Sequence, residues 1–484
     1  MMKNISALLF LGLILSMVSC GSDSTLKAPS SENTPIQTEA TETEAETKDM
    51  AVYADLPSKD FGGMVFNILH YEEAGLVQTI HAEQMNGEPI NDALYSHSLS
   101  VEQSLNIDIE KICSDINGVD TIVKECTAAG DSTYAVFFQH LAKSANLAID
   151  GNCYPLNDIE NFDFSKPWWK QSLMEDVSVG ENVYMAFGDI NLYTYESMTV
   201  MAFNKELLEE FHKESPYDLV DRNEWTFDNF LSILKDVKQD VNGNGIYGED
   251  LEDIFALGGY PSMSFEAFFH SQGLSLVTKD ENNIPQFNGM SDRYYDFYMR
   301  MSNLISDKDR VCYGVNFKMN FANGKQLFVA GPMMFVGSSF RDMEADFGVV
   351  PYPKADDEQA EYSGTITTQI QPVCIFTTNP DPEGTAIILE NLAAESHRQV
   401  LDVYYNTLLE NKYIRDEKSV EMIDMIYNSD IHIGLESIFD WSGIVTLFND
   451  TMREGGENII SQLEKKQKSI QKQIDKMVNN LNSN

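Results

Sequence analysis

The chain has 484 residues, and its 33 basic and 76 acidic residues give a formal net charge of −43. A field of that sign repels phosphate backbones and anionic lipid head groups, which excludes nucleic acid as an expected partner and disfavours strongly anionic ligands. Hydrophobic residues make up 43% of the chain, enough for sizeable cores, and its length corresponds to two large domains or three small ones.

The N-terminus combines an apolar run with a polar tether. The run from Ile5 to Val18 predicts a secretory signal peptide over residues 1–19. Cys20 follows in MVSC, which resembles a bacterial lipobox with Met17 at the usual leucine position. Residues 20–50 are too poor in apolar side chains to form a core. We therefore expect lipidation at Cys20, a disordered tether, and a body held on the extracellular side of the bacterial cytoplasmic membrane. The alternative is cleavage elsewhere, with Cys20 incidental.

Beyond residue 50, short β-prone apolar runs alternate with helical segments. In chain order the sequence predicts a strand at 64–71, a helix and then a strand within 91–113, a helix at 118–130, a mixed apolar segment at 134–141, a helix at 225–240, strands within 326–337, 347–354 and 368–378, and a helix at 382–396. Thr226 is the candidate N-cap of the helix at 225–240, and Trp225 is expected in the core. Alternation of this kind predicts an α/β fold with largely parallel sheets flanked by helices.

The C-terminal segment 457–481 carries one apolar helical stripe. Its members are three, four or seven residues apart: Ile459, Leu463, Ile470, Ile474, Met477 and Leu481. We expect this stripe to pack on the body rather than on a coiled-coil partner, and the protein to be a monomer.

Five cysteines remain beyond Cys20, and they show neither CxxC nor Cys/His metal spacing. A body of this size does not need disulfides. We expect mostly buried free thiols, with a Cys113–Cys126 bridge as the alternative.

One loop has the spacing of a calcium site. Oxygen-bearing side chains alternate in DVNGNGIYGEDLED, and Gly245 allows the sharp turn of an EF-hand-type loop. The position that normally supplies the last carboxylate ligand of such a loop is occupied by Leu251. The candidate Ca²⁺ ligands are Asp240, Asn242, Asn244, the Ile246 carbonyl, Asp250 and Glu252. We expect a structural ion here; an acidic turn without metal is the alternative.

Local enzyme signatures are missing: the sequence has no GxSxG, HExxH, GxxxxGK[ST] or strand-linked GxGxxG. A carboxylate pair for glycoside hydrolysis has no local sequence motif, so the possibility of such a pair stays open. Aromatic residues in polar surroundings are typical of sugar sites, where rings meet flat C–H faces. The candidates are Trp168, Trp169, Tyr193, Tyr195, Phe335 and Trp441. For each of them core packing is the alternative.

Several segments, taken in order, resemble the extracellular solute-binding lipoproteins of ABC importers, in the carbohydrate-type class that includes maltose-binding-like proteins. They are LNDIENFDFSKPWWKQS, GENVYMAFGDINLYTYESMTVMAFNKELLEE, WTFDNFLSILKDV with DVNGNG, FANGKQLFVAGPMMFVGSSFRDMEADFGVVPYPK and FDWSGI. The resemblance implies two α/β lobes of the type II binding-protein fold, with a ligand cleft at a hinge. It implies crossings near 187–191, 368–372 and 431–440, a first lobe of 51–188 plus 372–430, and a second of 189–371 plus 431–484.

The resemblance also implies a function without a chemical step. The ligand, expected to be an oligosaccharide, bridges the lobes, and the permease subunits recognise the closed form. The candidate ligand-binding residues are Tyr71, Glu72, Trp168, Trp169, Asp189, Tyr193, Tyr195, Phe335, Arg341 and Trp441. The rival hypotheses are a secreted polysaccharide-acting enzyme, an adhesion or sensing protein without a transporter, and a receptor for peptides or another solute.

Overall fold

The computed structural model describes residues 52–72, 79–247, 252–260, 264–314, 316–410 and 414–483. Contacts group Tyr53–Asn484 into one compact body, separate from Met1–Val52. The expected signal peptide and tether, including Cys20, therefore lie outside the described residues. In the described part, no helix is long and apolar enough to cross a membrane.

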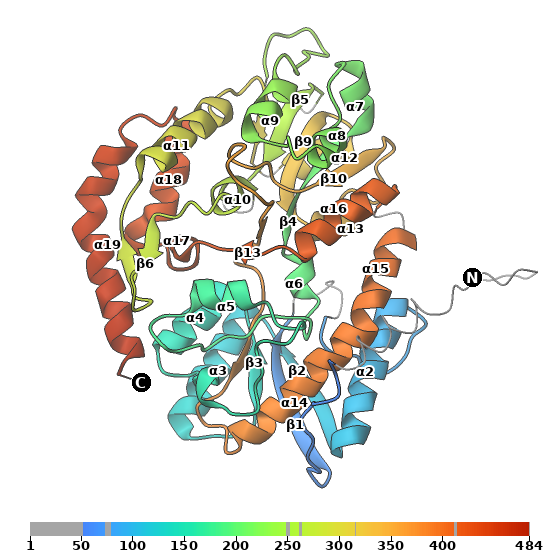
Figure 1. Ribbon diagram of the computed structural model, residues 1–484, viewed down its shortest axis with the longest axis vertical. Coiled ribbons are helices and arrows are strands. Elements are labelled where there is room, and N and C mark those ends of the chain that lie inside the picture. Colours follow the sequence, from blue (N-terminus) through green and yellow to red (C-terminus); the bar gives the residue numbers. More distant parts are fainter. Residues whose placement is uncertain are drawn as a thin grey trace, which may run out of the picture. The chain divides into compact units, whose positions relative to one another are not determined.

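The first sheet has four strands in the order β12-β3-β1-β2 (Figure 1). Their bounds are β1 Met64–Tyr71, β2 Ile107–Ser114, β3 Val136–Phe138 and β12 Val373–Ile375. Strands β1, β2 and β3 are parallel, and β12 is antiparallel to β3. The accompanying helices are α2 Pro89–Leu105, α3 Ile116–Ala129, α4 Leu141–Ile149, α5 Gln171–Val177 and α14 Pro382–Glu395.

The second sheet has five strands in the order β10-β4-β9-β5-β8. Their bounds are β4 Thr199–Asn204, β5 Phe255–Gly259, β8 Val311–Tyr313, β9 Gln326–Pro332 and β10 Phe347–Val350. Its neighbouring helices are α7 Lys205–Glu210, α8 Pro216–Asp221, α9 Phe227–Leu234, α10 Ala267–His270, α11 Asp292–Ile305, α12 Phe317–Ala322, α13 Met334–Ser338 and α18 Ile444–Arg453. The expected α/β class, with helix-flanked and largely parallel sheets, is confirmed.

Each sheet contains one strand that runs antiparallel to its neighbours. In each case it is the first strand that the chain forms after it crosses from the other sheet. In the second sheet β4 runs against both of its neighbours, β9 and β10. In the first sheet the reversed strand is β12. A strand that begins at the carboxyl edge of a parallel sheet must run against the others. The chain therefore enters both sheets at their carboxyl edges.

The two crossing segments, 186–199 and 364–373, are paired with each other. Ala186 and Val373 exchange backbone hydrogen bonds of 3.1 and 3.0 Å, and Thr367 N donates to Ser197 O at 3.1 Å. The second crossing begins with β11, Gly364–Thr365, which pairs in parallel with β13, Ile431–His432. We call the paired segments 186–199 and 364–373 the hinge segments.

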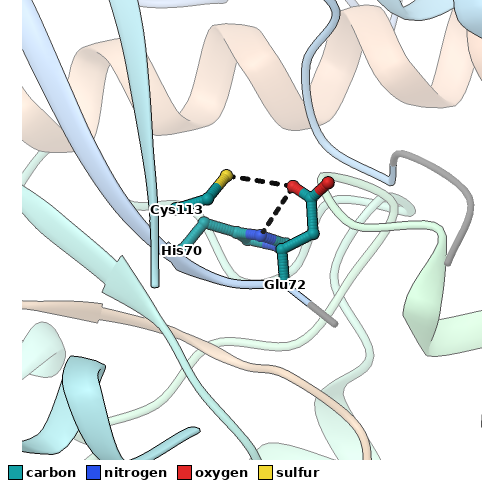
Figure 2. A group of neighbouring side chains, drawn as sticks. All are labelled: His70, Glu72 and Cys113. Atoms are coloured by element: carbon teal, nitrogen blue, oxygen red, sulfur yellow. Dashed lines mark hydrogen bonds and ion pairs between the residues drawn. The ribbon is translucent and has the colours of Figure 1, made fainter. Parts of the chain in front are cut away.

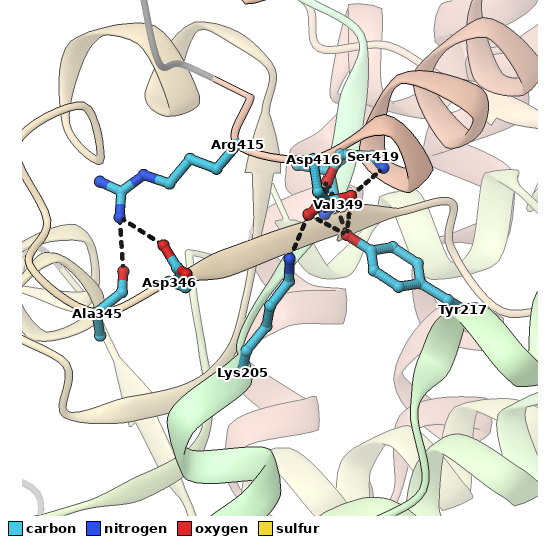
Figure 3. A network of polar contacts seen from close by, with 8 residues as sticks. All are labelled: Lys205, Tyr217, Ala345, Asp346, Val349, Arg415, Asp416 and Ser419. Carbon is cyan, nitrogen blue, oxygen red and sulfur yellow. Dashed lines mark hydrogen bonds and ion pairs between the residues drawn. The ribbon is translucent and has the colours of Figure 1, made fainter.

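Helix α16, Glu417–Tyr427, corrects part of the expected lobe division. It falls within 372–430, which was assigned to the first lobe, but it packs against β10 of the second sheet. Figure 3 shows the contacts: Lys205 forms an ion pair with Asp416, and Ser419 Oγ accepts a hydrogen bond from Val349 N at 3.0 Å. The chain therefore passes to the second sheet along α15, Leu401–Glu410. The other expected boundaries stay predictions.

The C-terminal helix α19, Ile459–Leu481, buries the whole predicted stripe, from Ile459 to Leu481. It packs on the hairpin formed by β6, Val277–Lys279, and β7, Pro285–Phe287. The expectation that this face covers the body is confirmed.

The predicted helix at 225–240 is shorter than expected. Thr226 caps α9 by accepting from Asn229 N at 3.4 Å, and Trp225 is fully buried, as predicted. The helix ends at Leu234, because Lys235 is extended (ψ 131°) and Asp236 takes a left-handed φ of 64°.

Candidate ligand-binding site

The carboxyl edge of the first sheet brings together side chains from two strand ends, those of β1 and β3. Strand β1 lies between β2 and β3. The connection that follows β1 leads to one side of it, and the connection that follows β2 returns across β1 to the other side. Ligands bind at such switch points in open α/β sheets. Tyr71 ends β1, and its ring meets His140 edge-on, with centroids 4.6 Å apart. Glu72 follows Tyr71, half-buried at the same edge.

The crossing segments lie against this edge. Leu141 N, just past β3, donates to Ile370 O at 2.9 Å. Asn191 links the two crossings through its Nδ2, which donates to Gln371 O at 3.1 Å. Tyr193, in the short helix α6 (Tyr193–Glu196), follows directly. Tyr71, Glu72 and Tyr193 therefore belong to one region around the hinge.

The carboxyl edge of the second sheet offers aromatic side chains. Phe335 follows β9 but is only 6% exposed, and the Lys318 ammonium lies 4.5 Å from its ring centroid. Tyr313 ends β8, with the Arg453 guanidinium 4.1 Å from its ring centroid. Tyr260 follows β5 and is 37% exposed. Sequence reasoning missed Tyr260 and Tyr313, although each closes an apolar run, FALGGY and VCY.

Arg341 is exposed. Its carbonyl oxygen accepts a hydrogen bond of 3.2 Å from Arg415, which precedes α16. This contact fixes the Arg341 backbone beside Arg415, and a role of its side chain in ligand binding stays a prediction.

Trp168 and Trp169 are core residues, so the expectation that they line a cleft is wrong. Their exposed fractions are 0% and 3%. Both indole N–H groups donate to the carboxylate of Glu390 on α14, at 2.8 and 3.0 Å. Because each ring is buried and each polar atom is bonded within the protein, neither offers a free face to a solute.

Asp189 and Tyr195 form a buried network that ties the first crossing to the helices after α14. The Asp189 carboxylate accepts from the Tyr195 hydroxyl and pairs with His397, while its backbone oxygen accepts from Ser396 Oγ at 2.5 Å. Both residues are 1% exposed. Their role here is to hold the hinge segment in place, and the expected direct contact with ligand is not supported.

Trp441 was expected to present a free ring face because Ser442 and Gly443 follow it; this is wrong. The ring is 5% exposed and stacks on Phe439 at 5.0 Å. Ser442 is held on α19, since its N–H donates to Gln473 at 2.9 Å and its carbonyl accepts from Lys466. The short helix at Trp441 is therefore closed against the C-terminal helix.

Two small cavities lie beside the hinge in the described part of the chain. They share Glu266, His270 and Ser437, and each has about 10 Å³, room for one water molecule. Burial raises the pKa of Glu266, whose carboxylate accepts from Ser437 Oγ at 2.6 Å. Cavities of this size are too small to hold a sugar.

The predicted calcium loop folds around Asp240. Its carboxylate accepts from Gly243 N at 2.6 Å and from Gly245 N at 2.7 Å, and both glycines have a positive φ. The side-chain oxygens of the next two candidate ligands accept from backbone N–H groups within the loop: Asn242 from Asn244, and Asn244 from Ile246. Glu252 is exposed, and Asp250 lies outside the described residues.

Asp253 is a further candidate ligand that sequence reasoning missed. It is fully buried; one carboxylate oxygen accepts from Val241 N at 3.0 Å, and the other has no hydrogen-bond partner among the described residues. A buried carboxylate oxygen without a partner is costly, and a cation in the loop would satisfy it.

No protein-family model matches the chain, and no curated protein matches it in sequence. Solved structures do match in fold. A cyclo/maltodextrin-binding protein complexed with maltotetraose superposes with a TM-score of 0.55 at 11% identity, over 88% of this chain and 98% of that one. A cyclic α-maltosyl-1,6-maltose binding protein from Arthrobacter globiformis gives 0.55 at 13%, over 87% and 99%.

An ABC transporter solute-binding protein from Agrobacterium radiobacter K84, in complex with ribitol, gives a TM-score of 0.51 at 12% identity, over 86% of this chain and 100% of that one. The chain has the two-lobed fold of these solute-binding proteins. The fold implied by the sequence resemblance is therefore confirmed.

Buried histidines near the first sheet predict acid sensitivity. Burial lowers the pKa of His81 and of His97 to about 4, whereas an unfolded histidine has a pKa of about 6.5. Below pH 6.5 the unfolded chain binds protons that the folded chain does not, so stability falls as the pH is lowered towards 4. His97→Gln should reduce that decline by on the order of 2–3 kcal/mol.

The measurement is the free energy of unfolding, by chemical denaturation at several pH values. His212→Asn, at an exposed histidine, is the control and should leave the decline unchanged. An equal decline in wild type and His97→Gln would contradict the assignment.

Proposed function

We propose that this chain is an extracellular solute-binding protein of the carbohydrate-type ABC importer class, which captures an oligosaccharide and delivers it to a permease. The observation that carries the proposal is the pair of reversed strands, β4 and β12. They place the carboxyl edges of both sheets at one hinge, where binding proteins with this fold hold their ligands.

Capture follows from the hinge. A solute that contacts the strand ends of both sheets, Tyr260 among them, is bound most tightly when the lobes are close together. It therefore shifts the population towards the closed form, to an extent set by how much more tightly it binds the closed form than the open form. The permease then recognises that form. Binding and release need no bond-making step, so we propose no enzymatic activity.

The solute class follows from charge and from the fold. The net charge of −43 opposes an anionic ligand. Aromatic rings at the strand ends, such as Tyr260 and Tyr313, suit the C–H faces of neutral sugars. Solved proteins with this fold bind maltotetraose and ribitol, which supports a neutral glycan.

Tyr260→Ala should weaken glycan binding about 30-fold or more, because losing an interface anchor costs roughly 2 kcal/mol or more. Isothermal titration calorimetry with maltotetraose, a cyclic α-glucan and ribitol, alongside a neutral tetrapeptide, measures the effect. Tyr295→Ala is the matched control: that ring is also 37% exposed but lies on α11, so its loss should leave the affinity unchanged.

Three results would contradict the proposal. They are binding of the peptide alone, equal losses in Tyr260→Ala and Tyr295→Ala, and glycan turnover during the titration, which would indicate an enzyme.

We further propose that the Asp240 loop holds a structural Ca²⁺ ion. Asp240, Asn242, Asn244 and the Ile246 carbonyl supply oxygens at EF-hand-like spacing. The unpartnered oxygen of buried Asp253 supports a closing role for that residue. When bound, the ion would pin the loop between α9 and β5.

Calcium at a hundredfold excess over its Kd should stabilise the protein by about 2.7 kcal/mol, because it binds only the folded state. Asp240→Ala and Asp253→Asn should each remove the Ca²⁺-dependent rise in melting temperature, measured by differential scanning calorimetry. Asp280→Ala is the control, since Asp280 also accepts from two backbone N–H groups in a turn. If chelator and added calcium both leave the wild-type curve unmoved, the loop is only a turn.

We also propose that Cys20 is lipidated and anchors the protein outside the cytoplasmic membrane. Cys20→Ala should release the protein from membranes or block its processing, and Cys126→Ala should do neither. Membrane fractionation with mass spectrometry of the N-terminus measures both. Unchanged retention and processing in Cys20→Ala would defeat the lipobox interpretation.

A further inference from the structure

Three potential metal ligands share one face of the first sheet. His70 and Glu72 are two residues apart at the end of β1, so their side chains point to the same side. The parallel register pairs His70 with Cys113 on β2. One ligand atom from each of the three lies within 4.8 Å of the others. Figure 2 shows the three side chains converging.

His70 is buried without hydrogen-bond partners. Its exposed fraction is 4%, and neither ring nitrogen has a hydrogen-bond partner within the described part of the chain; Nδ1 lies 4.0 Å from Glu72 Oε2. Gln371 lies close enough to influence the imidazole, yet its own Oε1 is also without a hydrogen bond. A buried polar group left unpaired costs on the order of 1–3 kcal/mol. A neutral imidazole is also the form that binds metal ions.

The other two donors already face each other. Cys113 Sγ donates to Glu72 Oε2 at 3.0 Å, and the Lys111 ammonium lies 3.0 Å from the same oxygen. The S–H···O contact shows that the two donor atoms already converge without a metal ion. All five cysteines after residue 51 are free. The alternative Cys113–Cys126 bridge is therefore wrong, and Cys113 remains available as a ligand.

We propose that His70, Glu72 and Cys113 form a site for a Zn²⁺-class divalent ion, separate from the calcium loop and beyond the proposed solute capture. One imidazole nitrogen, one carboxylate oxygen and one sulfur are the ligand types that zinc prefers, and three protein ligands leave a fourth position for water. On binding, the Cys113 S–H bond breaks, a sulfur–metal bond forms, and one proton leaves to solvent. No oxidation or reduction is involved.

Lys111 sets the strength of this site. Its ammonium neutralises the Glu72 carboxylate and competes with the metal for the same oxygen. Removing that charge should therefore tighten metal binding, whereas removing a metal ligand should abolish it. These opposite directions distinguish a metal site from a general effect of mutation on folding.

The test uses the full chain, stripped of metal with a chelator, and titrates it with Zn²⁺ against a chromophoric competitor. Wild type should bind one equivalent at this site and release about one proton, and Co²⁺ should give a thiolate-to-cobalt charge-transfer band. Cys113→Ser should lose the band and weaken zinc binding at least 10-fold. Cys126→Ser should match wild type, and Lys111→Gln should bind several-fold more tightly.

Circular dichroism melting checks that each variant is folded. Because the cobalt band is read first on wild type, a variant that fails to fold does not decide the test. It is overturned if wild type shows no thiolate band and binds zinc no better than Cys113→Ser. It is also overturned if Cys126→Ser loses the band equally.

Discussion

The fold depends on the antiparallel entry of β4 and β12 into sheets that otherwise run in one direction. A segment that leaves one sheet and enters the other at its carboxyl edge must reverse direction there. Two such exchanges bring the carboxyl edges of both sheets to the same hinge. The backbone pairing of 186–199 with 364–373 holds that arrangement, and the buried Asp189 network fastens one crossing to neighbouring helices.

Local patterning predicted most of the framework. The strand at 64–71, the helix at 382–396 and the C-terminal stripe follow from hydrophobic periodicity, and their bounds agree with the structure to within a few residues. Helix α16 was assigned to the wrong lobe because its partners, Lys205 and Val349, are distant in sequence. Periodicity identifies a helix and its buried face but not the sheet that the face covers.

The site was harder to predict because the residues that contact one another in it are also distant in sequence. Trp168 and Trp169 look like cleft aromatics in sequence, but the residue that binds both, Glu390, lies 222 and 221 positions away. No sequence motif identifies the His70–Cys113 pair, because the two residues lie on different parallel strands and the connection between those strands separates them in the sequence. Tyr71 and Glu72 were identified correctly as strand-end residues, whereas Tyr260 and Tyr313 needed the sheet order to be noticed.

The central claim is that a neutral glycan closes two lobes about the paired crossings. Small-angle X-ray scattering of the full chain, with and without saturating maltotetraose or the glycan that calorimetry selects, tests it most directly. The account predicts a smaller radius of gyration in the bound sample, because closure brings the lobes together. A saturated sample whose radius of gyration equals that of the free protein would contradict capture by hinge closure.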